Sequence, residues 1–596
     1  MSSQIKHTQV NLDGLLEVLG QNLYSTPAVA LRELIQNAHD ACLRYQLEAG
    51  HPKAFQIDLY TDPGNNVLVI QDNGSGLTRD EVGDYLATIG SGYTRILRQR
   101  TATDEMIGYF GLGFLSAYVV ADKVEVYTTS YQEPESTWLF TSSGGKTFSI
   151  SESASQSVGS RIVLRLKAGF SELSDSGVVS ALVRKYCSLL PIPITINERP
   201  EPINNVTPPW AEQGVSPLQL KRRQMAFAEL FEADYAPLAC ISLPENDLDL
   251  DGLLWIQDGS SYVSSDSRNV SVFIRNMFIT DKEADLLPRW AGFVGLVVES
   301  PRFKPTASRE SLQEDDYYRR VREFIREALV TGLRNLVLQE PEAWGRILVR
   351  HNQALIGAAV VDDRLFEATK RSIKLPTNTG EFTVPQLVKK SQGALYLKPE
   401  VAASSEDMLL AAQGIPLIKG YLYGVSAYCQ KFSQLEGVRL RNLGTGEGQE
   451  QLLRRVTVSA VVEQRLTALF EEPDVDVRFA EFEPDEVPLV YFSNRDAIRK
   501  NRIESDEAAS RISSAALSLA RLHTRTIEQD KERIVYVNLL NPVIQKLSSL
   551  DGAITRDFAN VVKCCVASAQ DGDEKDDSMV TRLSTFGASM LTLMEQ

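Results

Sequence analysis

The order of structural patterns in the first 193 residues constrains the fold more than any other feature of this chain. A capped helix comes first, and four short runs then alternate apolar and polar residues, at 54–60, 66–72, 123–130 and 160–167. Alternation with a period of two is typical of strands that bury one face. The pattern therefore predicts an α/β sandwich in which helices cover one face of a sheet.

The helix predicted at 25–45 carries a polar stripe. Pro27 suits its first turn. Glu33, Asn37 and Asp40 recur at i, i+4 and i+7, which places them on one side of the helix, while apolar residues occupy the other side. Such a stripe is either a solvated helix face or a set of side chains gathered for chemistry.

Three further segments accompany this helix. Asp72 ends an apolar strand and Gly76 lies in the turn that follows, although Asp-Asn-Gly also suits a simple hairpin. Ser160 stands at the head of the last strand. Glycines before a helix can let backbone amides face phosphate oxygens. Glycines precede an apolar helix in this way at Gly108, Gly111 and Gly113.

Together, the four segments resemble the signature boxes of the GHKL ATPases in order and spacing. Within that group, their amino-acid sequences are most similar to those of the heat-shock-90 chaperones. The similar stretches include LYSTPAVALRELIQNAHDA, IGYFGLGFLSAYVVADKV and GSRIVLRLK. Residues 272–300 and ASRESLQ at 307–313 resemble the middle domain of the same family. One departure lies in the segment that forms a lid over the nucleotide in that family. The family usually has TIAKSGT there, whereas this chain has TIGSGYT and lacks the lysine, so the resemblance does not predict when the lid closes.

The resemblance implies an α+β multidomain fold. It consists of an N-terminal GHKL (Bergerat) α/β sandwich, an α/β middle domain, and a mixed C-terminal dimerisation domain that ends in helices. A proline-rich stretch at 191–210 and the glycine-rich LGTGEGQEQ are the candidate boundaries. We therefore expect domains at 1–205, 206–442 and 443–596.

The resemblance also implies ATP and Mg²⁺ as ligands. Asp72 would accept the adenine amino hydrogen, supported by Gly76 and Ser160. Asn37 would offer its amide oxygen to Mg²⁺, and Asp40 would hold the site together. Backbone amides from the glycine segment would face the phosphates, at Gly108, Phe110, Gly111, Leu112, Gly113 and Phe114.

The resemblance implies that catalysis needs residues from two parts of the chain. Glu33 would orient or deprotonate the attacking water. Arg309 would supply the cation for the γ-phosphate, with Gln313 one helical turn later on the same face. The alternative for Arg309 is an ordinary surface arginine.

The function implied is an ATP-dependent chaperone that remodels client polypeptides. Opposed C-terminal helices would hold a homodimer, unless they fold back on their own domain. A MutL-type or topoisomerase-type enzyme is a rival, but no Toprim or nuclease carboxylate cluster or basic stripe is found. A histidine kinase lacks a recognisable dimerisation histidine, and a nucleotide-gated scaffold with little turnover stays open.

Composition bears on partners and location. Lys and Arg number 62 against 78 Asp and Glu, a formal charge of −16, so no nucleic-acid partner is expected. Apolar runs are too short for a membrane span, no signal peptide is evident, and the six cysteines are scattered, so a cytoplasmic location is expected. The terminal TLMEQ differs from the MEEVD tail that docks tetratricopeptide co-chaperones, which points to a bacterial member.

Overall fold

The structure is a computed structural model. The residues that it describes are 27–50, 53–88, 114–145, 147–212, 214–232, 234–259, 268–306, 311–401, 405–443, 453–493, 495–508, 531–550 and 553–570. The chain divides into two compact units, 1–350 and 351–596.

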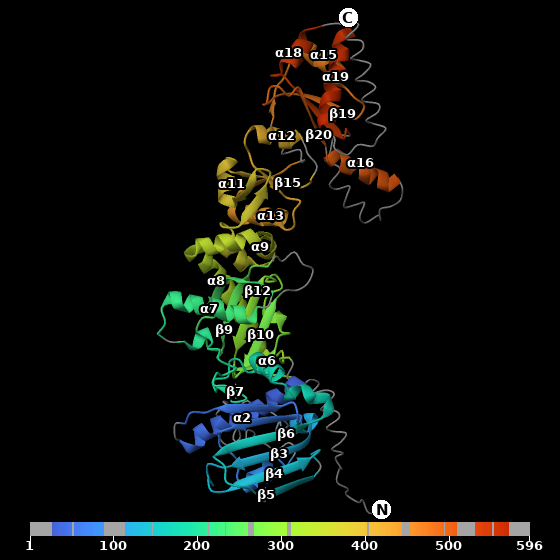
Figure 1. The fold of residues 1–596 in the computed structure, drawn as a ribbon. Coiled ribbons are helices and arrows are strands. Elements are labelled where there is room, and N and C mark those ends of the chain that lie inside the picture. The colour runs from blue at the N-terminus through green and yellow to red at the C-terminus, as the bar shows by residue number, and fades with distance from the viewer. Residues whose placement is uncertain are drawn as a thin grey trace, which may run out of the picture. The chain divides into compact units, whose positions relative to one another are not determined.

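A seven-stranded sheet forms the first part of unit 1 (Figure 1), in the order β5-β4-β3-β6-β2-β1-β7. Neighbouring strands are antiparallel, except that β7 runs parallel to β1. The strands are β1 (Ile57–Asp62), β2 (Val67–Asp72), β3 (Ala121–Thr129), β4 (Thr137–Ser143), β5 (Thr147–Glu152), β6 (Gly159–Leu166) and β7 (Ile194–Ile196). The four predicted strands are therefore β1, β2, β3 and β6.

Helices pack on this sheet because alternate strand residues give it an apolar face. Leu68 and Ile70 of β2 lie in one buried cluster with Leu34 and Ile35 of the long helix α2. This part of the chain contains α2 (Pro27–Ala49), α3 (Arg79–Tyr85), α5 (Leu115–Val120), the 3₁₀ segment η1 (Ala168–Ser174) and α6 (Ser176–Tyr186). The predicted sandwich with a helical face is confirmed.

A second sheet in unit 1 has the order β11-β10-β12-β9-β8. Its strands are β8 (Pro237–Ser242), β9 (Asp251–Gln257), β10 (Asn269–Ile274), β11 (Met277–Thr280) and β12 (Val294–Glu299). The helical segments around it are η2 (Pro209–Ala211), α7 (Pro217–Phe231), η3 (Ala284–Leu286), α8 (Asp316–Gln339) and the start of α9 (Pro341–Val361). Ile203 packs on the first core and Val206 on the core of this second sheet.

Unit 2 contains two more sheets, β14-β13-β16-β15-β17 and β18-β19-β21-β20. The first comprises β13 (Lys374–Thr377), β14 (Gly380–Thr383), β15 (Ala394–Lys398), β16 (Leu417–Lys419) and β17 (Arg439–Asn442), with helices α10 (Asp363–Thr369), α11 (Val384–Lys390), α12 (Ser405–Ala412) and α13 (Val425–Glu436).

The last sheet comprises β18 (Arg454–Arg455), β19 (Val475–Glu481), β20 (Leu489–Ser493) and β21 (Arg533–Asn538). Its helices are α15 (Ala460–Phe470), α16 (Arg495–Ala508), α18 (Pro542–Ser549) and α19 (Ala553–Gln570). Residues from α15, α18 and α19 share a buried core with β19, β20 and β21. A search of the described residues found no helix with the length and apolar character that a bilayer crossing requires.

Candidate functional site

The polar stripe of α2 is covered rather than solvated. Glu33 is 2% exposed and Asp40 is 7% exposed, and Asn37 between them is half-buried. Arg32 on the same helix donates to Glu33, with 3.5 Å between Nη2 and Oε1. A solvated helix face would expose these carboxylates, so that interpretation is wrong. Isolated carboxylates are also costly to bury, and they therefore need partners.

Asp72 ends β2 as a buried carboxylic acid. The backbone N–H of Gly74 donates to its Oδ1 at 2.8 Å. Burial raises the pKa of Asp72 to about 7, against the effects of hydrogen bonds from the backbone amides of Gly74 and Ser160 and of the positive charge on Lys53. The Asp72 side chain can therefore change between donor and acceptor near neutral pH.

The turn after Asp72 leads into a helix and not into a paired strand. Residues 73–78 join β2 to α3, so the hairpin interpretation of Asp-Asn-Gly is wrong. Gly76 has φ +57°, and a Cβ there would lie 2.0 Å from the carbonyl oxygen of Thr129. Glycine is required at this position because the turn runs against the backbone of β3.

Ser160 lies beside Asp72, because the two residues are partners in the register of β2 and β6. Its Oγ is 3.0 Å from Oγ1 of Thr128 on β3. Thr128 also accepts a hydrogen bond from the N–H of Leu77 at 2.9 Å. Thr128 was missed by sequence reasoning, since only the strand pairing brings it to this site.

The helix and the turn meet at Ala41. The N–H of Ser75 donates to the carbonyl oxygen of Ala41 at 3.0 Å, and a Cβ on Gly74 would lie 2.6 Å from the carbonyl carbon of Ala41. Burial raises the pKa of the neighbouring Cys42 thiol, and the charges of Asp72 and Asp40 add to the effect. The structure thus brings the end of the polar stripe and the buried Asp72 to one place.

Phe114 is the part of the glycine segment that the structure describes. Its ring packs edge-on against Tyr118 and Phe140, with centroids 5.7 and 6.3 Å apart. The phosphate contact assigned to its backbone stays a prediction. The other predicted phosphate-facing residues lie outside the described residues, as does Arg309; they are Gly108, Phe110, Gly111, Leu112 and Gly113.

Gln313 does not lie on a helix with Arg309, so that expectation is wrong. Residues 311–315 precede α8, which begins at Asp316, and Leu312 forms a bridge with Pro305. The side-chain amide of Gln313 donates to the carbonyl oxygen of Pro305 at 2.9 Å. Asp315 caps α8 by accepting from the N–H of Tyr318, and the helix cannot reach back to Gln313 past that cap.

Two family models match this chain. Residues 24–158 match the model described as histidine kinase-, DNA gyrase B-, and HSP90-like ATPase. Residues 193–366 match the model described as Hsp90 protein, which covers the second sheet and α8. Residues 193–366 therefore match the Hsp90 family itself, and residues 24–158 match the wider group of ATPases that includes it. The resemblance found in the sequence is confirmed.

Individual relatives agree with this assignment. "Chaperone protein HtpG" of Paramagnetospirillum magneticum is 30% identical over 360 residues, which are 57% of this chain and 56% of that protein. "Chaperone protein HtpG" of Bacteroides thetaiotaomicron is 27% identical over 410 residues, 64% and 60% of the two chains. "Heat shock protein 75 kDa, mitochondrial" of Rattus norvegicus is 30% identical over 339 residues, 54% and 47%. The matched part of the chain spans 47% to 60% of the length of these relatives.

Proposed function

We propose that this Hsp90-family chain binds and hydrolyses ATP and uses the cycle to remodel client polypeptides. The observation that carries the proposal is the buried Asp72 beside the covered polar stripe of α2. Burial of the Asp72 carboxyl is costly, since its pKa stays raised despite the nearby charge of Lys53, and a ligand that donates to it would offset that cost.

Asp72 would accept a hydrogen from the adenine amino group. The half-exposed hydroxyl of Ser160 and the turn at Gly76 lie next to this acceptor. Asp72 lies within residues 24–158, and the match of that region to the model of histidine kinase-, DNA gyrase B-, and HSP90-like ATPases supports this role by similarity.

Asn37 fits the role of a magnesium ligand. Its amide oxygen belongs to the ligand class that Mg²⁺ prefers, and Mg²⁺ at nucleotide sites takes few protein ligands because phosphates supply the rest. When bound, the ion would neutralise the phosphate charge. Glu33 lies one helical turn before Asn37 and would orient or deprotonate the attacking water.

Arg309 would complete the site from outside the N-terminal sheet. Gln313 has a different part in this proposal than the sequence suggested. It holds the backbone at Pro305, and so it supports the segment that precedes Arg309 rather than touching the nucleotide.

We also propose that α18 and α19 contribute to a homodimer. Leu547 is buried in the core of its own domain, and Val562 and Val566 pack there as well, so these residues follow the fold-back alternative. Leu550 and Phe558 remain 45% and 46% exposed and are among the described apolar residues of this region that a second copy could cover.

The test is steady-state phosphate release and ATP binding by calorimetry, with and without an unfolded client protein, together with aggregation suppression. Glu33→Ala should bind ATP normally and hydrolyse it at least about 10²-fold more slowly. Glu125→Ala, which removes a partly buried carboxylate elsewhere in the same sheet, should retain turnover. Binding without turnover in the wild type would favour a scaffold, and stimulation by DNA would favour the repair-enzyme alternative.

A further inference from the structure

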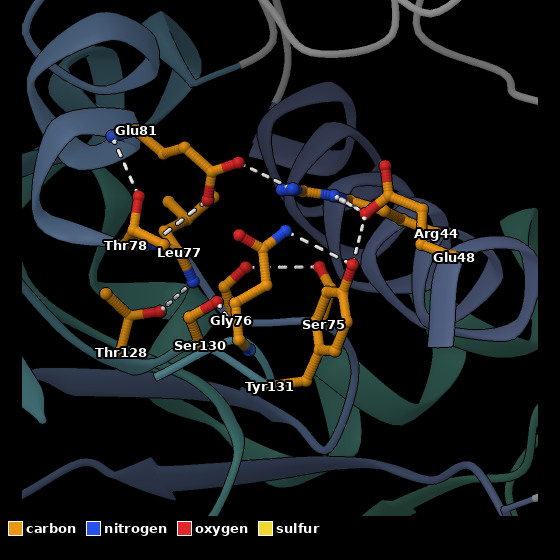
Figure 2. A network of polar contacts seen from close by, with 11 residues as sticks. Arg44, Glu48, Ser75, Gly76, Leu77, Thr78, Glu81, Thr128, Ser130 and Tyr131 are labelled. Atoms are coloured by element: carbon orange, nitrogen blue, oxygen red, sulfur yellow. Dashed lines mark hydrogen bonds and ion pairs between the residues drawn. The ribbon is translucent and has the colours of Figure 1, made fainter. Parts of the chain in front are cut away.

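Arg44 is a buried cation in the same helix as the polar stripe. It lies one turn after Asp40 on α2 and is 4% exposed. Its Nε donates to Glu48 Oε2 at 2.9 Å and its Nη2 donates to Glu81 Oε1 at 2.5 Å (Figure 2). One guanidinium therefore joins α2 to α3.

Glu81 passes this contact on to the turn. It occupies the third position of α3 and forms a capping box with Thr78. Its Oε2 accepts from the N–H of Thr78 at 3.0 Å, while its Oε1 accepts from Arg44. Glu81 thus connects its ion pair with Arg44 to Thr78, which lies two positions after Gly76.

Other contacts hold the same turn from the side of β3. The N–H of Tyr131 donates to the carbonyl oxygen of Ser75 at 3.0 Å, and the hydroxyl of Tyr131 donates to Glu48 Oε2 at 3.0 Å (Figure 2). Glu48 is therefore shared by Arg44 and Tyr131. The network closes around the turn from both sides.

The charges favour a single arrangement. Burial disfavours the charged form of Arg44, but the hydrogen bonds and negative charges of Glu81 and Glu48 outweigh it and raise the pKa of the guanidinium. Without Arg44, the two partly buried carboxylates would lose the cation that lies between them, and their like charges would disfavour the present arrangement. Loss of the arginine would therefore displace α3 and the turn.

We propose that Arg44 is a positioning residue for adenine recognition, acting through Glu81 and Thr78 to hold the turn that follows Asp72. The inference rests on the proposed ATP site. The sequence patterns that predicted the site indicated no role for Arg44.

The test compares ATP with purine riboside triphosphate, an analogue that lacks the 6-amino group. Arg44→Met in the full chain should raise the Kd for ATP and for ADP about tenfold, because both carry the adenine. The Kd for the analogue should change less than about threefold, because its contact with Asp72 is already lost. The kcat at saturating ATP should stay within about twofold, since Glu33 and Asn37 are untouched.

Three variants serve as controls. Arg44→Lys keeps a cation between the carboxylates and should recover most of the ATP affinity. Glu81→Gln leaves Arg44 paired with Glu48, so it weakens the link without stranding a buried cation, and it should raise the Kd for ATP in the same direction. Lys123→Met removes a cation from the Lys123–Glu125 pair elsewhere in the sheet and should bind ATP as the wild type does.

The outcomes separate the inference from the function on which it rests. A wild-type chain that binds no ATP would refute the proposed site itself. A wild type that binds ATP, with Arg44→Met and Glu81→Gln equally tight, would overturn the positioning role. Equal losses for ATP and for the analogue would also overturn it. A reduced kcat with unchanged Kd would show that Arg44 serves folding alone.

Discussion

The hydroxyl oxygens of Ser160 and Thr128 lie 3.0 Å apart on neighbouring strands, so a side-chain hydrogen bond adds to the pairing of β6 with β3 beside Asp72. Thr128 also accepts from the N–H of Leu77 in the turn. A single side chain thereby connects the strand that carries Ser160 with the turn that carries Gly76. The adenine side of the proposed site depends on this threonine as much as on the residues of the recognised segments.

Thr128→Val should weaken both folding and nucleotide binding. Valine has nearly the same shape but leaves the N–H of Leu77 without its acceptor, which costs about 1–3 kcal/mol. Thermal unfolding and ATP calorimetry measure the two effects. Thr128→Ser keeps the hydroxyl and should retain most of both. A valine variant with wild-type stability and affinity would show that the hydroxyl contact is incidental.

Asp72→Asn should abolish ATP binding and stabilise the nucleotide-free protein at alkaline pH. Burial raises the pKa of Asp72 to about 7, whereas an unfolded aspartate titrates near about 3.9. The folded state holds its proton more tightly, so this contribution to stability is complete below about pH 4 and is lost as the pH rises through about 7. The loss amounts to at most about 4 kcal/mol.

The measurement is the melting temperature of both proteins at pH 5 and pH 8 without nucleotide. The advantage of the asparagine variant should be larger at pH 8. Titrating groups away from Asp72 behave alike in both proteins and cancel in the difference. A difference that does not change with pH would contradict the raised pKa.

Arg309→Ala should leave ATP affinity unchanged and lower turnover. An arginine on a transferring phosphoryl group is worth about 10³–10⁵ in rate, less where a conformational step limits turnover, so we expect a loss of at least about tenfold. The segment 1–205 alone should also bind ATP and hydrolyse it poorly. Arg302→Ala is the control, since that arginine is 41% exposed and pairs with Asp249. Full activity in the isolated segment would refute the assignment.

Phe558→Asp and Leu550→Asp should convert a dimer into monomers. A charge at either exposed apolar position costs nothing in a monomer but opposes burial against a second copy. Light scattering measures the mass, and turnover should fall when the dimer is lost, because linked nucleotide domains meet at high effective concentration. Leu435→Asp, on the exposed side of α13, is the control. Variants that stay dimeric would place the interface elsewhere.

Local periodicity predicted the elements that depend on local patterns. The helix at 25–45 and the strands now called β1, β2, β3 and β6 were all found. The buried stripe of Glu33, Asn37 and Asp40 was correctly placed on one helix. These features follow from residue spacing alone.

Contacts between distant segments could not be predicted in this way. Thr128 lies beside Ser160 because of strand register, and Arg44 contacts the helix cap at Glu81; local patterns placed both residues on the right elements but could not predict these contacts. Gln313 was misplaced because Asp315 begins the helix after it.

The place of β6 between β3 and β2 has a consequence for synthesis of the protein. A nascent chain that has emerged as far as β5 already carries Glu33, Asn37 and Asp72. It lacks the strand that supplies Ser160 and joins the two halves of the sheet. Such a chain lacks part of the proposed adenine site, so we expect that on the ribosome it cannot take up ATP before this sheet is complete.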